Sequence, residues 1–206
     1  MTDTTIFVIR LILFAGIHSL LALPQIKQLL IRDRQSRNKT YRLFYNLISL
    51  VLFGWAMTAF RNSPVLYVAP GIWSLLMYLM QTIFLAILVS CIRQTGVAEF
   101  LGLPKSNSSN ILKTQLVTSG WYGIVRHPLY LFSMLFLIFN PVVTSRWLIL
   151  TLFSFAYFII GALIEERRLL RDFGNEYKLY RQRVPFLVPA LTKSCHSTSP
   201  ESGQEH

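Results

Sequence analysis

Charged residues are scarce in this chain. Only 14% of its 206 residues are Asp, Glu, Lys or Arg, whereas 53% are hydrophobic. A water-soluble domain carries roughly 25% charged residues, which help to cover its surface. The low charge therefore excludes a typical soluble globule, and the high hydrophobic content excludes disorder over most of the chain. The composition indicates a small membrane protein.

Cysteine and acidic residues are also few. Two cysteines, Cys91 and Cys195, are too few for a disulfide framework, and no His/Cys spacing is typical of a metal site, so we expect no metal. Nine acidic residues stand against 20 basic ones, for a formal net charge of +11. In a nucleic-acid-binding protein the basic residues gather on one face of a soluble fold. Here the basic residues lie in short segments between apolar runs, as in membrane proteins. We therefore expect the chain to contact a lipid bilayer and not to bind nucleic acid.

Long apolar runs dominate what remains, and they number five: 5–23, 43–60, 65–92, 129–139 and 147–164. Helices are expected because a helix satisfies its own backbone in hydrocarbon and because no run alternates with a period of two. The third run is long enough to span with tilt. The fourth is short for a hydrocarbon core of about 30 Å, so it either begins near His127 or forms half of a tight helical hairpin turning at 140–146. The predicted fold class is an all-α, polytopic transmembrane bundle of about five helices.

The basic residues alternate with these runs in a way that predicts orientation. Seventeen of the 20 lie in three blocks, 24–42, 93–126 and the region after Ile164, whereas the alternate loops carry only Arg61 and Arg146. The positive-inside rule then places the N-terminus outside and the C-terminus in the cytoplasm. We expect one integral membrane domain over residues 1–189 and a disordered polar tail over 190–206.

Polar residues gather where the fourth run begins. Arg126, His127 and Tyr130 surround Pro128, which suits the first turn of a helix and pushes His127 away from helical geometry. Backbone N–H groups at such a helix start favour an anionic group. The same residues also fit an interfacial belt that anchors a helix end in the headgroup region, and spacing alone favours the belt.

Two adjacent carboxylates, Glu165 and Glu166, follow the last apolar run in a chain with few acids. Ionisable groups at a membrane boundary indicate a functional site, although a solvated cluster paired with Arg167 and Arg168 fits equally well. The amphipathic segment 169–189 is expected to be an interfacial helix interrupted near Gly174, serving either as a mechanical anchor or as a lid over a pocket. A further lone histidine, His18, is more typical of a packing residue than of a ligand.

Taken in order, RHPLY, NP, EER, FGNEYKLY and RVPFLVP resemble a known pattern. It is similar to that of the isoprenylcysteine carboxyl methyltransferase and phospholipid methyltransferase superfamily of integral membrane enzymes, over roughly residues 114–189. The N-terminal HSLLALPQIK and YRLFYN resemble a bacterial branch that includes methanethiol S-methyltransferase, so we expect a bacterial inner membrane as the location.

The resemblance implies S-adenosylmethionine (SAM) as the methyl donor, bound at the cytoplasmic side between the last hairpin and the C-terminal segment. Catalytic roles would fall to His127 and Glu166. The residues alone do not show whether His127, Glu166 or a tyrosine would assist deprotonation of the acceptor. Asn107 is a weaker candidate from the preceding loop. The cofactor-binding residues would be Leu116, Val117, Tyr122, His127, Pro128, Leu129, Tyr130 and Glu165.

Two departures bear on the methyl acceptor. The arginine that meets the substrate carboxylate in prenylcysteine enzymes is replaced by Gly161, and a glycine two residues after the RHPLY tyrosine is replaced by Phe132. The loss of the arginine at position 161 argues for a small thiol or another lipophilic acceptor rather than a prenylcysteine. The larger Phe132 side chain either narrows a path from the site into the membrane or changes the packing of the helical hairpin. An NADPH-dependent membrane sterol or enone reductase, with a similar C-terminal pattern, and a non-catalytic membrane protein stay open as alternatives.

Overall fold

The computed structural model describes residues 3–23, 25–27, 37–59, 63–97 and 116–189. Its apolar helices match the five predicted runs, which confirms the polytopic helical bundle: α1 (Asp3–Ala22), α3 (Arg37–Met57), α4 (Ile72–Thr95), α6 (Pro128–Ile138) and α7 (Ser145–Phe173). Of these, α1, α4 and α7 are long and apolar enough to cross a membrane, and the apolar parts of α3 and α6 are shorter. The candidate Asn107 and the tail 190–206 lie outside the described residues.

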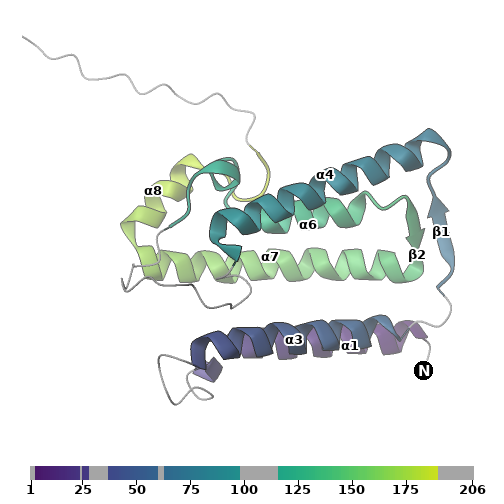
Figure 1. Cartoon of the computed structure of the whole chain (residues 1–206), viewed down its shortest axis with the longest axis horizontal. Coiled ribbons are helices and arrows are strands. Elements are labelled where there is room, and N and C mark those ends of the chain that lie inside the picture. The colour runs from purple at the N-terminus through teal and green to yellow at the C-terminus, as the bar shows by residue number, and fades with distance from the viewer. Residues whose placement is uncertain (1–2, 24, 28–36, 60–62, 98–115, 190–206) are drawn as a thin grey trace, which may run out of the picture.

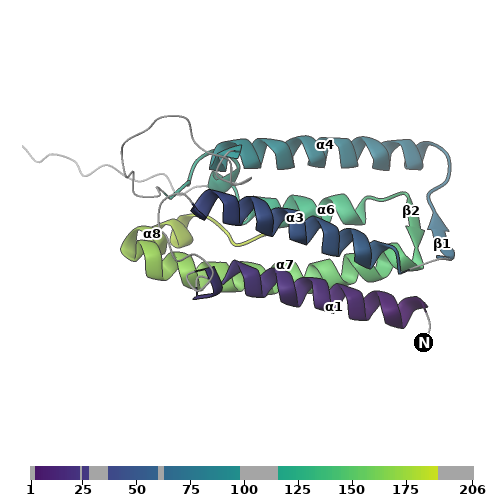
Figure 2. The same ribbon diagram turned by 60° about the horizontal axis from the view of Figure 1, so that its bottom comes forward.

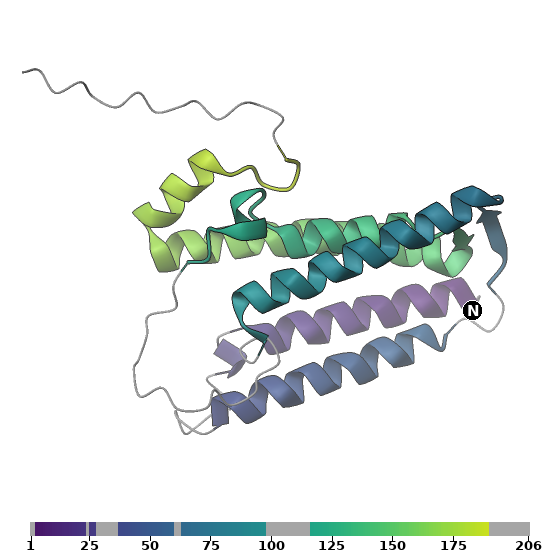
Figure 3. The same cartoon turned by 45° about the horizontal axis from the view of Figure 1, so that its top comes forward.

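The helices run side by side along one axis (Figures 1 and 3). One pair is formed by α1 and α3, and α6 packs on both α4 and α7. Figure 2 shows α4 and α1 on opposite sides of the bundle. A small core of Phe7, Leu11, Ala56 and Leu150 joins α1, α3 and α7. Many large apolar side chains on the outside, including Leu50, Leu75 and Ile164, stay exposed in the protein itself, as expected of surfaces that lipid covers.

The described parts of all three basic blocks lie at one end of the bundle, which also carries α8 (Asn175–Arg183) and the short 3₁₀ helix η1 (Gly120–Gly123). The N-terminus and both strands lie at the other end (Figure 1). This grouping agrees with the charge pattern of the sequence, because it places basic residues from distant parts of the chain on the same side.

Two short strands were not predicted, and they correct the expectation of continuous helix from residue 65. β1 (Val65–Val68) pairs antiparallel with β2 (Val142–Thr144), and β2 lies in the connection between α6 and α7. Pro64 and Pro70 flank β1, and proline restricts the residue before it to extended geometry. The β-branched and aromatic residues of β1 also favour a strand. Helix α4 therefore begins only at Ile72.

The expected hairpin between the fourth and fifth apolar runs is present. Helix α6 ends at Ile138 and α7 begins at Ser145. The Thr144 hydroxyl caps α7 by accepting from the Trp147 backbone N–H at 3.2 Å, and the Trp147 indole donates to the Leu137 carbonyl at 2.8 Å. These bonds satisfy backbone groups that the two helix ends would otherwise leave without partners.

Gly174 separates α7 from α8, at the position where the sequence predicts an interruption. Its φ of 56° and ψ of −120° lie in a region that residues with a Cβ rarely adopt. Its N–H donates to the Leu170 carbonyl at 3.0 Å, and its carbonyl accepts from Lys178 N–H at 3.2 Å. This single residue lets the chain leave α7 and turn back over the end of the bundle.

Replacing Gly174 by alanine should destabilise the turn by about 1–3 kcal/mol, because alanine is strained at this φ and ψ. Since the strain is local, α8 should detach first, and limited trypsin digestion should cut faster at Arg181 and Arg183. Gly54→Ala is the matched control: Gly54 lies inside helix α3 with nothing within 4 Å of an added Cβ. That variant should melt no lower than the wild type. Equal protease resistance in both variants would contradict the prediction.

Candidate functional site

The site is built on the start of α6. Pro128 is the first helical residue and His127 is the N-cap, with a non-helical φ of −124° and ψ of 61°. The prediction for this dipeptide is therefore confirmed. The His127 carbonyl accepts from Leu131 N–H at 3.1 Å, which closes the first helical turn. Its side chain points inward and is only 3% exposed.

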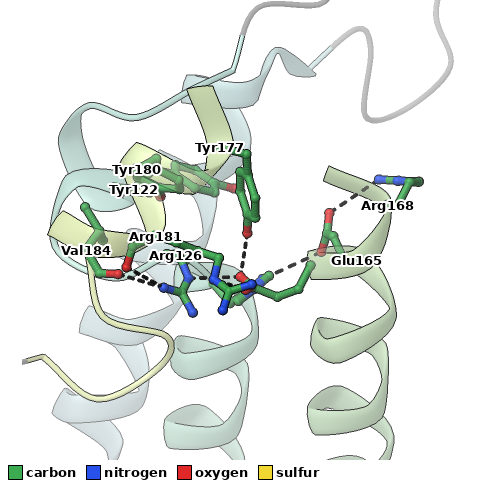
Figure 4. A network of polar contacts seen from close by, with 10 residues as sticks. Tyr122, Arg126, Glu165, Arg168, Tyr177, Tyr180, Arg181 and Val184 are labelled. Atoms are coloured by element: carbon green, nitrogen blue, oxygen red, sulfur yellow. Dashed lines mark hydrogen bonds and ion pairs between the residues drawn. The ribbon is translucent and has the colours of Figure 1, made fainter. Parts of the chain in front are cut away.

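The Glu166 carboxylate is the centre of the polar network. One oxygen, Oε1, accepts from Arg126 Nε at 2.9 Å and from His127 Nε2 at 3.0 Å, and the Tyr177 hydroxyl also donates to it. The other oxygen lies 3.7 Å from Arg181 Nε. Figure 4 shows donors from the α6 start and from α8 converging on this end of α7. Glu166 is therefore a buried, multiply bonded carboxylate, and the alternative of a solvated pair with Arg167 is wrong.

Arg126 fastens the C-terminal segment to the start of α6. Its Nη1 donates to the carbonyls of Arg181 and Val184, both at 3.0 Å, and its backbone N–H donates to the Pro185 carbonyl at 2.9 Å. The guanidinium also lies 5.6 Å from the centre of the Phe186 ring. Arg126 thus bonds to a carboxylate on α7 and to three backbone carbonyls in the segment from Arg181 to Pro185.

Glu165 has a different environment from its neighbour. Its side chain is 32% exposed, and Oε1 lies 3.5 Å from Arg168 Nη2 on the same helix, as expected for an i, i+3 pair. Its Oε2 lies 3.7 Å from His127 Nδ1, which is longer than a hydrogen bond. Since His127 Nε2 donates to Glu166, Nδ1 is the ring nitrogen that faces Glu165. Glu165 Oε2 and His127 Nδ1 are therefore neighbours that do not hydrogen-bond to each other, so each can bond to a ligand.

Aromatic rings surround the imidazole of His127. Tyr130 stacks on it with ring centres 5.6 Å apart, and Phe186 meets it edge to face at 5.0 Å. On its other side Tyr130 stacks on Phe158 of α7, also at 5.6 Å. The Tyr130 hydroxyl interacts with the Glu165 carboxylate. These rings fix the orientation of the imidazole and give the site apolar walls.

Two tyrosines of α8 connect it to the rest of the site. Burial and the hydrogen bond to Glu166 raise the pKa of Tyr177, so its hydroxyl keeps its proton at neutral pH and donates. Burial also raises the pKa of Tyr180, to about 12, and its hydroxyl donates to the Tyr122 carbonyl at 2.6 Å. Helix α8 is therefore held by buried hydrogen bonds.

The remaining predicted residues lie around the same end of the bundle. Leu116 packs against the cluster of Tyr177, Tyr180 and Val184, and Pro128 is fully buried. Burial raises the pKa of Tyr122, whose phenol interacts with Glu165. Val117 and Leu129 are half-buried, and no described contact links either one to Glu165.

The sequence analysis did not include four site residues from α8 and the segment after it: Tyr177, Tyr180, Arg181 and Phe186. The signal available was the i, i+3 spacing of Tyr177 and Tyr180, which we interpreted as one face of an interfacial helix. The two departures from the superfamily pattern also have structural counterparts. Phe132 packs against Phe84 of α4 and Trp121 of η1, and the Tyr130 hydroxyl occupies the space 3.7 Å from a Cβ built on Gly161.

Comparison with known proteins identifies relatives of this chain. Methanethiol S-methyltransferase 2 of Bradyrhizobium diazoefficiens is 31% identical over 186 residues, 87% of this chain and 70% of that protein. Methanethiol S-methyltransferase 1 of the same organism is 40% identical over 68 residues, 33% of this chain and 24% of that protein. Protein-S-isoprenylcysteine O-methyltransferase of Schizosaccharomyces pombe is 32% identical over 79 residues, 37% of this chain and 34% of that protein. No solved structure matches the chain.

These relatives confirm the resemblance to the isoprenylcysteine carboxyl methyltransferase-like superfamily and to its methanethiol S-methyltransferase branch. The chain spans 70% of the first relative and about a quarter to a third of the other two. The profile of the NnrU protein family matches residues 6–192, which is nearly the whole chain. The chain therefore belongs to the NnrU protein family.

Proposed function

We propose that this chain is a SAM-dependent integral membrane methyltransferase that acts on a small thiol or another lipophilic acceptor. The observation that carries the proposal is the convergence of His127 with Glu165 and Glu166. His127 and Glu166 are 39 residues apart in the sequence, yet Nε2 of His127 lies 3.0 Å from Oε1 of Glu166. Relatives named as methyltransferases support the reaction type.

The residues present suit SAM, which carries a carboxylate, an ammonium group, a ribose and an adenine ring. The partly exposed Glu165 carboxylate is a hydrogen-bond acceptor suited to the ribose or the ammonium group. The backbone N–H groups of Leu129 and Tyr130 suit the carboxylate. Because Nε2 of His127 carries the ring proton, Nδ1 is an acceptor and suits the ammonium group. Tyr122 and Tyr130 offer aromatic faces to the cationic or adenine part. When bound, SAM supplies a methyl group activated by a sulfonium.

His127 and Glu166 have different roles in this proposal. Glu166 Oε1 already accepts from three donors, so Glu166 holds the imidazole and Arg126 in place rather than taking up a proton. His127 is then a rigid group in direct contact with the ligand. Such a preorganised site favours displacement because the groups that align donor and acceptor do not have to reorganise.

The structure around Gly161 supports a neutral acceptor. A glycine here provides no cation for an acceptor carboxylate, and the nearby space holds the neutral Tyr130 phenol. The neighbouring positions facing outward on α7, Ile160 and Ile164, are apolar and exposed. An acceptor that reaches the site through lipid is therefore small or lipophilic, in keeping with relatives named for methanethiol.

Purified wild-type protein in detergent should bind SAM by isothermal titration calorimetry and transfer a labelled methyl group to one member of a panel of thiols, phospholipids and prenylcysteines. Glu165→Gln should weaken SAM binding at least about tenfold, the effect of losing about 1.4 kcal/mol, without lowering the melting temperature. Glu176→Gln, an exposed acid on α8, is the control and should bind normally. Absence of SAM binding in the wild type, or binding of NADPH instead, would reject the proposal.

Glu166→Gln should chiefly affect stability. It leaves the charge of Arg126 uncompensated, which costs on the order of 3 kcal/mol when a buried ion pair loses one partner. We expect a lower melting temperature and faster proteolysis of α8 than in Glu165→Gln. A Glu166→Gln protein as stable as the wild type would show that Glu166 does not hold the three segments together.

We further propose a bacterial inner-membrane location with the site in the cytoplasm. In a chain lacking Cys91 and Cys195, single cysteines introduced at the exposed Leu66 of β1 and Lys178 of α8 report opposite ends of the bundle. A membrane-impermeant thiol reagent should label position 66 in intact spheroplasts and position 178 only after lysis. The reverse pattern would invert the topology.

A further inference from the structure

A second, half-buried polar cluster joins α1, α3 and α7. His18 of α1 contacts Ser49 and Tyr45 of α3, with Nδ1 2.8 Å from Ser49 Oγ and Nε2 2.7 Å from the Tyr45 hydroxyl. The next residue, Ser19, contacts the Tyr157 hydroxyl of α7 at 3.0 Å. An ionisable side chain within apolar, membrane-length helices is costly to keep, so it indicates a function.

The hydrogen bonds define the state of His18. The Ser49 hydroxyl donates to the Tyr45 carbonyl at 2.8 Å, so its oxygen accepts from His18 and Nδ1 carries the proton. Nε2 of the neutral ring is then the acceptor, and the Tyr45 hydroxyl donates to it. Tyr45 therefore directs its proton at a basic nitrogen, while the Tyr45 oxygen retains lone pairs that can accept from another molecule.

One face of α7 connects this cluster with the candidate site. Tyr157, Gly161 and Glu165 are spaced by four residues and so follow one another along that face. Tyr157 lies about 12 Å from Glu165 along the helix axis, at about 1.5 Å per residue. Between them the Tyr130 hydroxyl fills the space beside Gly161. Tyr130 stacks on His127 at the candidate site, Tyr157 bonds to Ser19 beside His18, and the two tyrosines interact electrostatically with each other.

We propose that His18, acting through Tyr45, is the base that accepts the proton of a thiol acceptor. This inference rests on the proposed function and extends it to the acceptor side. The acceptor S–H bond breaks as its proton passes to the Tyr45 oxygen, and the Tyr45 proton passes to His18 Nε2. The products are a thiolate and an imidazolium, so charge is conserved and no electrons are gained or lost. The thiolate is the nucleophile for the methyl group.

The hydrogen bonds of the His18 ring allow it to take up a proton at Nε2. Among the residues that the structure describes, the titratable groups that face its ring are Tyr45 of α3 and Tyr157 of α7, and both are phenols. Ser49 remains bonded to Nδ1 in either charge state of the ring. Tyr41, one turn earlier on α3, differs because its hydroxyl donates to the Leu21 backbone carbonyl at 2.6 Å and so only joins two helices. Tyr41 is therefore the matched control for Tyr45.

The test compares pH profiles of methyl transfer from SAM to methanethiol. His18→Gln keeps hydrogen bonding but cannot take up a proton, so it should lower kcat/KM by about 100-fold or more near pH 7, the usual contribution of a general base. The loss should shrink as pH rises and the thiol ionises without help. SAM binding and melting temperature should match the wild type. Tyr45→Phe should give the same pattern, and Tyr41→Phe should not.

A readout that needs no methyl donor accompanies this profile. In protein labelled with ¹⁵N-histidine, the His18 signals should report protonated Nδ1, and adding methanethiol should shift Nε2 in the wild type but not in Tyr45→Phe. A loss of activity equal at all pH values, unaltered activity, or an Nε2 signal insensitive to the thiol would each overturn the role of His18. Failure of the wild type to bind SAM would instead overturn the proposed function.

Discussion

One buried carboxylate holds the cytoplasm-facing end of the fold together in our proposal. Glu166 accepts hydrogen bonds from the segment before α6 and from α8, while its own helix, α7, anchors it. Each donor would be costly to bury alone, and so would the carboxylate. The arrangement is stable only when all members are present, so α8 and the start of α6 depend on each other although 51 residues separate Arg126 from Tyr177 in the sequence.

The bundle could be predicted because its information is local. Low charge, five apolar runs and the spacing of basic blocks are each visible in short windows, and the Pro128 helix start and the Gly174 break follow from the backbone limits of single residues. The strand β1 was missed because its pairing partner lies far along the chain. A four-residue apolar stretch beside a long apolar helix carries no periodicity of its own.

The site could be predicted in part. The resemblance assigned Glu165 to cofactor binding and Glu166 to catalysis, yet the sequence gave no basis for predicting which of the two carboxylates is buried. Their difference arises from packing: Glu166 points towards Tyr177 and Arg126, while Glu165, one residue earlier, points towards the half-exposed side. Adjacent helical positions differ by about 100° in direction, so small rotations of α7 decide which carboxylate is buried, and only the tertiary structure reveals that rotation.

The pairing of β1 with β2 has a consequence for how the protein is made. Helix α6 is about 16 Å long, so the turn that follows it ends short of a full bilayer crossing. The backbone of that turn finds partners in residues 64–69, including bonds from Ala69 N–H to the Pro141 carbonyl and from Ser145 N–H to the Pro64 carbonyl. Because these partners precede the turn in the sequence, they are synthesised before it and are available when it forms. The earlier strand therefore supplies hydrogen-bond partners to backbone groups that lipid could not satisfy.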